Sequence, residues 1–283
     1  MLLIADSGST KTDWWLVKDK EIIKDKTVGF NPYFQTTEQI IEELSSNLVP
    51  HLKSHIEKEK LSIYFYGAGC SSEAKCSIVR NALLQVWPDA IIEIEHDLLA
   101  AARALCGRKP GIAAILGTGS NSCYYDGNRI VANVFSLGYL LGDEGSGAYL
   151  GKKMITTFLY NEFPEDLQTA LAGLITDSKE EILDSIYKKP LPSRYLASFS
   201  RYIPGVLSHP AMHKLVYQGL DDFFKHHVSK YPIHKEIPFN CVGSVAFHYK
   251  DILKEIVEDR KMIMGKIIES PIEALVNYHL QPN

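Results

Sequence analysis

Hydrophobic positions in the first part of the chain alternate between short apolar segments and longer amphipathic stretches. The short segments are rich in β-branched and aromatic residues and predict strands at 2–5, 13–17, 61–66 and 91–95. The longer stretches repeat apolar residues at helical spacing and predict helices at 37–58, 72–87 and 97–106. Pro50 lacks a backbone N–H, so we expect it to kink or divide the first helix. Strands that alternate with helices are typical of an α/β fold around a central sheet.

A second strand–turn–strand unit follows in the middle of the chain. Residues 111–116 predict a buried strand, residues 117–121 a turn of glycine and hydroxyl residues, and residues 123–125 another strand. The pattern is then mostly helical from 145 to about 231. Residues 239–242 predict a further buried strand and residues 251–268 an amphipathic helix. Two comparable strand–turn–strand units predict a duplicated fold with two lobes.

The boundary between the lobes is expected at the run Arg108-Lys109-Pro110-Gly111, which combines charge with two residues that break regular structure. We therefore expect an N-terminal lobe at 1–108 and a larger, more helical C-terminal lobe at 109–283. A length of 283 residues with 46% hydrophobic content also suits two cores better than one.

Composition excludes several classes of function. A net charge of −4 gives no basic field for a nucleic-acid backbone, so nucleic acid is not an expected partner. No apolar run approaches the ~18 residues that a membrane span needs, and the first residues lack the basic segment of an export signal. Five cysteines without a CxxC pair fit a reducing compartment. We expect a soluble cytoplasmic protein without a membrane partner.

The first candidate for chemistry is the turn Asp6-Ser7-Gly8-Ser9-Thr10-Lys11-Thr12. A carboxylate ends a strand, and the small residues after it let backbone N–H groups approach phosphate oxygens, with hydroxyls and an ammonium in reach. The alternative is a tight β-turn rich in turn-forming residues. The spacing is not that of a Walker A loop, because a strand rather than a helix is expected to follow.

Two later turns have similar chemistry. Gly117-Thr118-Gly119-Ser120-Asn121 follows a buried strand and offers N–H and O–H donors to phosphate oxygens. The segment 240–246 closes an apolar strand with small residues, so a flat ring such as adenine can lie against its backbone. Each turn has an ordinary structural interpretation on its own, whereas one phosphate-type turn in each lobe favours a nucleotide site.

Asp97 stands at the end of the strand 91–95 and opens the following helix. An N-cap of the helix is the structural interpretation of this residue. A strand end in an α/β lobe also faces the side where ligands bind, so the carboxylate can serve both purposes.

The ordered motifs DSGSTKT, HD at 96–97, GTGSN, GDEGS at 142–146 and VGS at 242–244 resemble those of the N-acetylglucosamine kinase family. That family belongs to the acetate and sugar kinase, chaperone and actin superfamily, and the motifs cover nearly the whole chain. The resemblance implies an α/β fold of two ribonuclease-H-like, actin-like ATPase lobes with a nucleotide cleft between them. It also implies ATP and Mg²⁺ as cofactors, an amino sugar such as N-acetylglucosamine or glucosamine as substrate, and a homodimer.

The resemblance also implies roles for individual residues. Asp97 would be the general base, and Asp6 would position Mg²⁺ through water. The nucleotide would contact Asp6, Gly8, Ser9, Thr10, Lys11, Gly117, Thr118, Gly119, Ser120, Gly243 and Ser244. The sugar would contact Asn31, Asp97, Thr118, Gly138 and Asp143. One departure concerns the segment before GDEGS, where Leu137 stands in place of the tryptophan of a Gly-Trp-Gly-like segment, and this bears on recognition of an N-acetyl group.

Two other functions share the nucleotide-binding core. One is an ATP-driven activator of 2-hydroxyacyl-CoA dehydratase or benzoyl-CoA reductase, which carries an iron–sulfur cluster between subunits. The cysteines here do not form an evident cluster-binding pattern, and GDEGS is typical of the sugar kinases. The other is a sugar sensor without turnover, against which the presence of Asp6, Asp97 and both phosphate-type turns argues.

Overall fold

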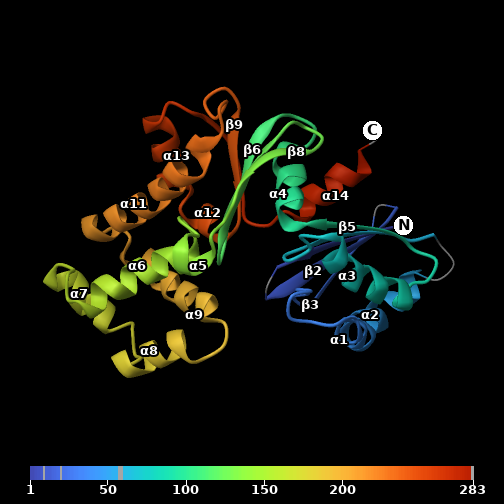
Figure 1. Cartoon of the computed structure of the whole chain (residues 1–283), viewed down its shortest axis with the longest axis horizontal. Coiled ribbons are helices and arrows are strands. Elements are labelled where there is room, and N and C mark those ends of the chain that lie inside the picture. The colour runs from blue at the N-terminus through green and yellow to red at the C-terminus, as the bar shows by residue number, and fades with distance from the viewer. Residues whose placement is uncertain (9, 20, 57–59, 282–283) are drawn as a thin grey trace. The chain divides into compact units, whose positions relative to one another are not determined.

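The computed structural model describes residues 1–8, 10–19, 21–56 and 60–281 (Figure 1). Contacts within the chain divide it into two compact units. Unit 1 comprises Met1–Gly107 and Pro271–Asn283, and unit 2 comprises Arg108–Ser270. Each unit is built around a mixed sheet of five strands with helices packed on it, as expected for two α/β lobes.

The sheet of unit 1 has the order β3-β2-β1-β4-β5. Its strands are β1 (Leu2–Ser7), β2 (Lys11–Lys18), β3 (Glu21–Val28), β4 (Ser62–Gly67) and β5 (Ile91–His96). The first three strands are antiparallel, while β1, β4 and β5 run parallel. Four of these strands match the predictions, and β3 was not predicted.

Helices cover both faces of this sheet (Figure 1). They are α1 (Thr37–Glu43), the π-helical turn η1 (Leu44–Leu48), α2 (Val49–Ile56), α3 (Glu73–Val86), α4 (Asp97–Cys106) and α14 (Ile272–Leu280). On one face, α1, α2 and α3 pack over a core that includes the buried aromatic side chains of Trp14, Phe30 and Phe65. On the other face, α4 and α14 pack against each other and against β1.

The predicted helix at 37–58 is interrupted before Pro50, as expected, and its last two residues lie outside the described part of the chain. The interruption is the turn η1, in which the helix widens. Pro50 cannot donate to the carbonyl four residues earlier and its ring crowds that carbonyl, and a widened turn relieves both problems.

The C-terminal helix α14 packs in unit 1, whereas the sequence placed residues 109–283 in one lobe. Its buried residues Ile272, Leu275 and Val276 lie on one face, which suits packing on α4 and β1. The phenol oxygen of Tyr66 on β4 lies 2.7 Å from Nε2 of His279 at the end of this helix. The last segment of the chain therefore packs on the first unit.

The sheet of unit 2 has the order β10-β9-β6-β7-β8. Its strands are β6 (Gly111–Leu116), β7 (Ser120–Tyr125), β8 (Ile130–Val134), β9 (Pro238–Val242) and β10 (Ile263–Ile268). The strands β6, β7 and β8 form an antiparallel meander, and β9 and β10 continue parallel to β6. This arrangement repeats that of unit 1, so the predicted duplication is confirmed.

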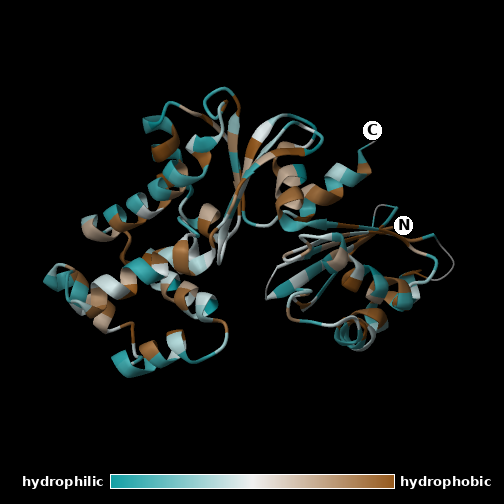
Figure 2. Ribbon diagram, in the orientation of Figure 1, coloured by the Kyte–Doolittle hydropathy of each residue, from teal (hydrophilic) through white to brown (hydrophobic). Residues whose placement is uncertain are grey.

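The rest of unit 2 is helical, as predicted. Its helices and helical turns are α5 (Gly138–Leu141), α6 (Gly147–Leu159), α7 (Glu165–Ala172), α8 (Lys179–Tyr187), α9 (Pro192–Phe199), η2 (Ser200–Tyr202), α10 (Ile203–Val206), α11 (Pro210–His226), η3 (Val228–Lys230), α12 (Ser244–His248) and α13 (Lys250–Asp259). Hydrophobic residues gather along the central strands and alternate with polar residues on the helices (Figure 2). Within the described residues, no helix is both long and apolar enough to cross a membrane.

The prediction of one helix at 251–268 was wrong in its second half. The helix α13 ends at Asp259, and Lys261 then takes a left-handed backbone conformation, with φ 53°, that no helix continues through. Residues 263–268 form β10 instead, because their β-branched residues pair in parallel with β9. A local irregularity between Met264 and Ile267 admits the Asn240 side chain, whose Oδ1 accepts the Lys266 N–H at 2.9 Å.

Candidate functional site

The candidate residues of unit 1 gather at the carboxyl edge of its sheet. Ser7, Gly67 and His96 are level with one another at the ends of the parallel strands β1, β4 and β5. Asp6 therefore lies at the end of β1 and Asp97 directly after β5. The carboxyl ends of parallel strands are where α/β folds place their ligands.

The first turn is held by buried hydroxyl groups. The N–H of Gly8 donates to the carbonyl of Lys11 at 3.0 Å, while Ser9 lies outside the described residues. Hydroxyl oxygens of Ser7 and Thr12 lie 2.8 Å apart, and both side chains are fully buried. The Ser7 Oγ accepts the N–H of Phe30 at 2.9 Å. These two hydroxyls thus stabilise the turn itself.

Thr10 and Lys11 stand at the exposed end of this turn. The carbonyl of Thr10 accepts the N–H of Gly29 at 3.1 Å, and the Lys11 ammonium lies 2.7 Å from the carboxylate of Asp13. Asp13 was not among the predicted site residues. It faces Asp6 across the β1–β2 pair and is nearly buried, with Lys26 as a second cationic neighbour at 3.7 Å. The sequence offers one signal for Asp13, because this acid follows the predicted turn directly, as Asp6 opens it.

Asp6 and Asp97 are both held in surroundings that disfavour their charged forms. Burial, followed by the charges of Asp13 and Asp97, raises the pKa of Asp6 to about 7, against a smaller lowering by Lys11. Burial also raises the pKa of Asp97, and His96 and the N–H of Leu98 oppose this in part. Two acids with raised pKa values at one sheet edge are typical of a functional site.

The structure corrects the capping role that the sequence suggested for Asp97. The N-cap of α4 is His96, whose Nδ1 accepts the N–H of Leu99 at 3.2 Å. Asp97 is the first helical residue, where a carboxylate is stabilised by the helix dipole. Its side chain is therefore not required as a cap.

Asn31 follows β3 and lies beside the loop after β4. Its Oδ1 accepts the N–H of Tyr33 at 3.0 Å, and its own N–H donates to Gln35 at 2.7 Å. Gly69 has φ +85°, and a Cβ there would come within 2.5 Å of the Asn31 Oδ1. Because Ser7 holds the neighbouring Phe30, Asn31 is fixed near the first turn.

In unit 2, the N-terminus of α6 orients the turn 117–121. The N–H groups of Gly147 and Ala148 donate to the carbonyls of Gly117 and Thr118, at 2.8 and 3.1 Å. In a trans peptide the following N–H points opposite to the carbonyl. The N–H groups of Thr118 and Gly119 are therefore directed away from α6, as a pair that suits an anion.

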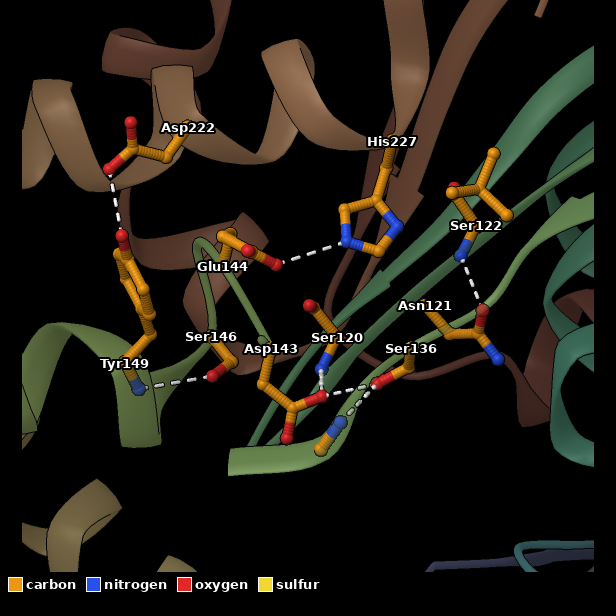
Figure 3. A network of polar contacts seen from close by, with 12 residues as sticks. Ser120, Asn121, Ser122, Ser136, Asp143, Glu144, Ser146, Tyr149, Asp222 and His227 are labelled. Atoms are coloured by element: carbon orange, nitrogen blue, oxygen red, sulfur yellow. Dashed lines mark hydrogen bonds and ion pairs between the residues drawn. The ribbon is translucent and has the colours of Figure 1, made fainter. Parts of the chain in front are cut away.

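Asp143 is held against this turn by contacts on its Oδ1 (Figure 3). The hydroxyl of Ser136 donates to Oδ1 at 2.5 Å, and the N–H of Ser120 lies at 3.4 Å from the same atom. A Cβ on Gly119 would lie 3.0 Å from Oδ2, so a side chain there would press on the Asp143 carboxylate. The predicted residue Gly138 joins the same network, because its N–H donates to Ser136 Oγ at 3.3 Å. Ser136 was not predicted.

The third motif reaches the same turn from β9. Gly243 has φ +123°, and a Cβ there would lie 2.3 Å from the carbonyl oxygen of Leu116, immediately before the turn. Ser244 begins α12. The turn 117–121, Asp143 and Gly243 are therefore neighbours within unit 2. In the described part of the chain, no group of three or more His, Cys, Asp or Glu side chains could hold a metal ion by itself.

Comparison with solved structures defines the class of the fold. MreB5 from Spiroplasma citri, in structures bound to ADP and to AMPPNP, matches with TM-scores of 0.52 and 0.56 at 11% and 10% identity. Each match covers 98% of this chain and 94% of the other. The chain therefore has the two-lobed actin-like ATPase fold that the resemblance implied.

A closer relationship defines the family. The solved structure of a putative N-acetylglucosamine kinase from Porphyromonas gingivalis matches with a TM-score of 0.93 and 43% identity, over 99% of this chain and 98% of that one. The chain therefore belongs to the N-acetylglucosamine kinase family, as the motifs indicated.

A curated relative agrees. The N-acetylmuramic acid/N-acetylglucosamine kinase of Clostridium acetobutylicum is 25% identical over 174 residues, which are 60% of this chain. The match spans 56% of that relative, a little over half of its length. The sequence matches no protein-family model.

Proposed function

We propose that this chain transfers the γ-phosphate of ATP to a hydroxyl of an amino sugar such as N-acetylglucosamine or glucosamine. The observation that carries the proposal is Asp97 at the carboxyl edge of the unit 1 sheet, close enough to Asp6 for their charges to interact. The family of the chain and its actin-like fold support the same activity.

Asp97 is proposed as the general base. It accepts the proton of the sugar hydroxyl, whose oxygen forms the new bond to the γ-phosphorus as the bond to the β-phosphate oxygen breaks and ADP leaves. The raised pKa makes the carboxylate a stronger base than an exposed aspartate, and the ionised form is the one that acts.

Backbone groups and small residues are proposed to bind ATP. The N–H groups of Thr118 and Gly119 would meet phosphate oxygens, with Gly8, Thr10 and Lys11 as donors from the first turn, where Ser9 is also proposed. The hydroxyl of Ser120 is buried and has no hydrogen-bond partner among the described residues, which fits a ligand that supplies one. Gly243 and Ser244 would lie beside the adenine side of the nucleotide.

Asp6 fits a Mg²⁺ ion held through water. Burial, followed by the charges of Asp13 and Asp97, raises the pKa of Asp6, and the positive charge of a divalent ion would favour its ionised form. Mg²⁺ retains several waters and needs only one or two carboxylates, which agrees with a site of few acidic ligands. When bound, the ion neutralises charge on the phosphates.

The sugar is proposed to contact Asn31, Thr118, Gly138 and Asp143. Ser136 and Ser120 occupy Oδ1 of Asp143, and Oδ2 would accept a sugar hydroxyl. Leu137 is largely exposed, at 62%, where the family pattern has an aromatic residue, so the assay below compares sugars with and without an N-acetyl group.

The other candidate functions have less support. A cluster-bearing activator would need thiolate ligands that a cluster between subunits can reach, whereas Cys70, Cys76, Cys123 and Cys241 are buried. A cytoplasmic location and a homodimer stay predictions from the sequence and the resemblance.

The test is a coupled assay of ADP release with Mg²⁺ and a panel of sugars: N-acetylglucosamine, glucosamine, N-acetylmuramic acid, N-acetylmannosamine and glucose. We expect sugar-dependent ADP release with at least one amino sugar that exceeds the release with glucose by about 10-fold or more. Absence of sugar-dependent release with every member of the panel would overturn the proposal.

A further inference from the structure

The loop 142–146 places two neighbouring acids on opposite sides. Asp143 faces the turn 117–121, whereas Glu144 turns back toward α11 (Figure 3). Asp143 has φ 55° and Gly145 has φ 72°. A residue other than glycine in this region is strained by roughly 1–2 kcal/mol, so contacts around the loop must hold it in place.

Glu144 supplies one such contact. Its Oε2 lies 3.1 Å from Nε2 of His227, and the two side chains are only 15% and 4% exposed. His227 caps the C-terminus of α11, where its N–H donates to the carbonyl of Phe223 at 2.9 Å. Its ring stacks on that of Phe223, with centroids 5.1 Å apart. Contacts with Phe223 therefore hold the imidazole in place independently of the loop 142–146.

Gly145 packs on the same end of α11. A Cβ at this glycine would lie 3.0 Å from the Cβ of Phe223. The loop thus rests on two residues of one helical turn, Phe223 through a close backbone approach and His227 through a charged hydrogen bond.

Loss of the imidazole would leave the Glu144 carboxylate buried without its partner, which is costly. Turning toward water would relieve this cost. Because Glu144 follows Asp143 directly, a shift of the loop that accompanies this turn would move the Asp143 carboxylate away from Ser136 and Ser120.

We propose that His227 is a positioning residue that sets the orientation of Asp143 through Glu144. It does not touch the substrate itself. The proposal rests on the proposed function in one respect, because Asp143 must bind the sugar for the effect to appear in catalysis.

The test uses His227→Phe, which keeps a stacked ring and removes the nitrogen donor, and His227→Gln, whose amide can again donate to Glu144. We expect His227→Phe to raise KM for the sugar by about 10- to 100-fold and to change KM for ATP less than twofold. His227→Gln should recover most of the loss.

A matched control lies at the other end of the same helix. His209 is the N-cap of α11, its Nδ1 accepts the N–H of Ala211 at 3.1 Å, and its Nε2 lies 3.3 Å from Asp166. His209→Ala should lower the thermal midpoint and leave KM for the sugar unchanged. An unchanged sugar KM in His227→Phe, or equal losses in the Phe and Gln variants, would overturn the proposal.

A second measurement does not depend on turnover. Amide hydrogen exchange in the segment 142–149 should become about 10-fold faster in His227→Phe and stay unchanged in His209→Ala. Equal protection of this segment in His227→Phe and the unaltered protein would contradict the anchoring, whereas failure of the proposed function would appear as a lack of activity in the unaltered protein.

Discussion

At the scale of residues, three carboxylates at one edge of unit 1 differ in their surroundings. Asp13 has two lysine ammonium groups within 4 Å, at 2.7 and 3.7 Å. Asp6 feels the repulsion of Asp13 and Asp97 together with burial, and its pKa rises to about 7. The negative charge of this edge is therefore only partly compensated by the two lysines.

The raised pKa of Asp6 predicts how the stability of the unliganded protein depends on pH. An aspartate in the unfolded chain has its ordinary pKa of 3.8, whereas the pKa of Asp6 in the folded protein is about 7. Between these values the folded state holds a proton that the unfolded chain releases. Stability contributed by the protonated group is present below pH ~4 and is lost as pH rises toward 7.

We expect Asp6→Asn to increase the free energy of unfolding by about 1–3 kcal/mol at pH 8 and to change it little at pH 4. Each pKa unit corresponds to about 1.4 kcal/mol, and the figure is reduced because Asp6 keeps some contact with solvent. Urea denaturation at the two pH values measures the difference. The same shift at both values would show that the ionisation of Asp6 is not its cause.

Sequence motifs predicted Asp6 and Asp143, because glycine and hydroxyl residues around them form recognisable patterns, and Asp97 was predicted from its place after the strand 91–95. They did not predict Ser136, which lies outside any motif. The contact between His227 and Glu144 could not be predicted either, because the two residues are 83 positions apart and nothing local marks the pair. Contacts made by tertiary packing leave no trace in the spacing of residues.

At the scale of elements, prediction succeeded where apolar spacing and boundary residues agreed. The helix α4 begins at Asp97 and ends at Cys106, as predicted, because alanine and leucine fill its interior. The strand β3 was missed, since it lies at the sheet edge and is mostly exposed, and its residues lack the apolar alternation of a half-buried strand. In the segment 251–268, apolar residues at helical spacing continue from α13 into β10. The pattern therefore did not show where the helix ends.

The close approach of Gly243 to β6 gives a test at this scale. In Gly243→Ala, the new Cβ would meet the carbonyl oxygen of Leu116 at 2.3 Å in a backbone region unsuited to alanine. We expect a loss of at least about 2 kcal/mol in stability and about 10-fold weaker ATP binding, measured by denaturation and by calorimetry.

The control is Gly205→Ala in α10, where nothing lies within 4 Å of the new Cβ. Alanine is favoured over glycine in a helix, so this variant should be as stable as the unaltered protein or slightly more so. ATP binding in Gly243→Ala as tight as in this control would show that the turn does not depend on the glycine.

At the scale of the whole molecule, the two units repeat one strand order, with an antiparallel meander followed by parallel strands. The sequence predicted this duplication from the two strand–turn–strand units. It could not show that the final helix belongs with unit 1, since the apolar face of α14 would suit the surface of either sheet. Membership of the N-acetylglucosamine kinase family follows from the chain as a whole.

The most direct test of the proposed kinase activity compares Asp97→Asn with the unaltered protein, using N-acetylglucosamine, ATP and Mg²⁺. The substitution preserves shape and removes the proton acceptor, so we expect sugar-dependent ADP release to fall by about 10²-fold or more, while calorimetry shows ATP binding within about threefold of the unaltered protein. Turnover close to that of the unaltered protein would contradict the role of Asp97 and with it the proposed chemistry of this site.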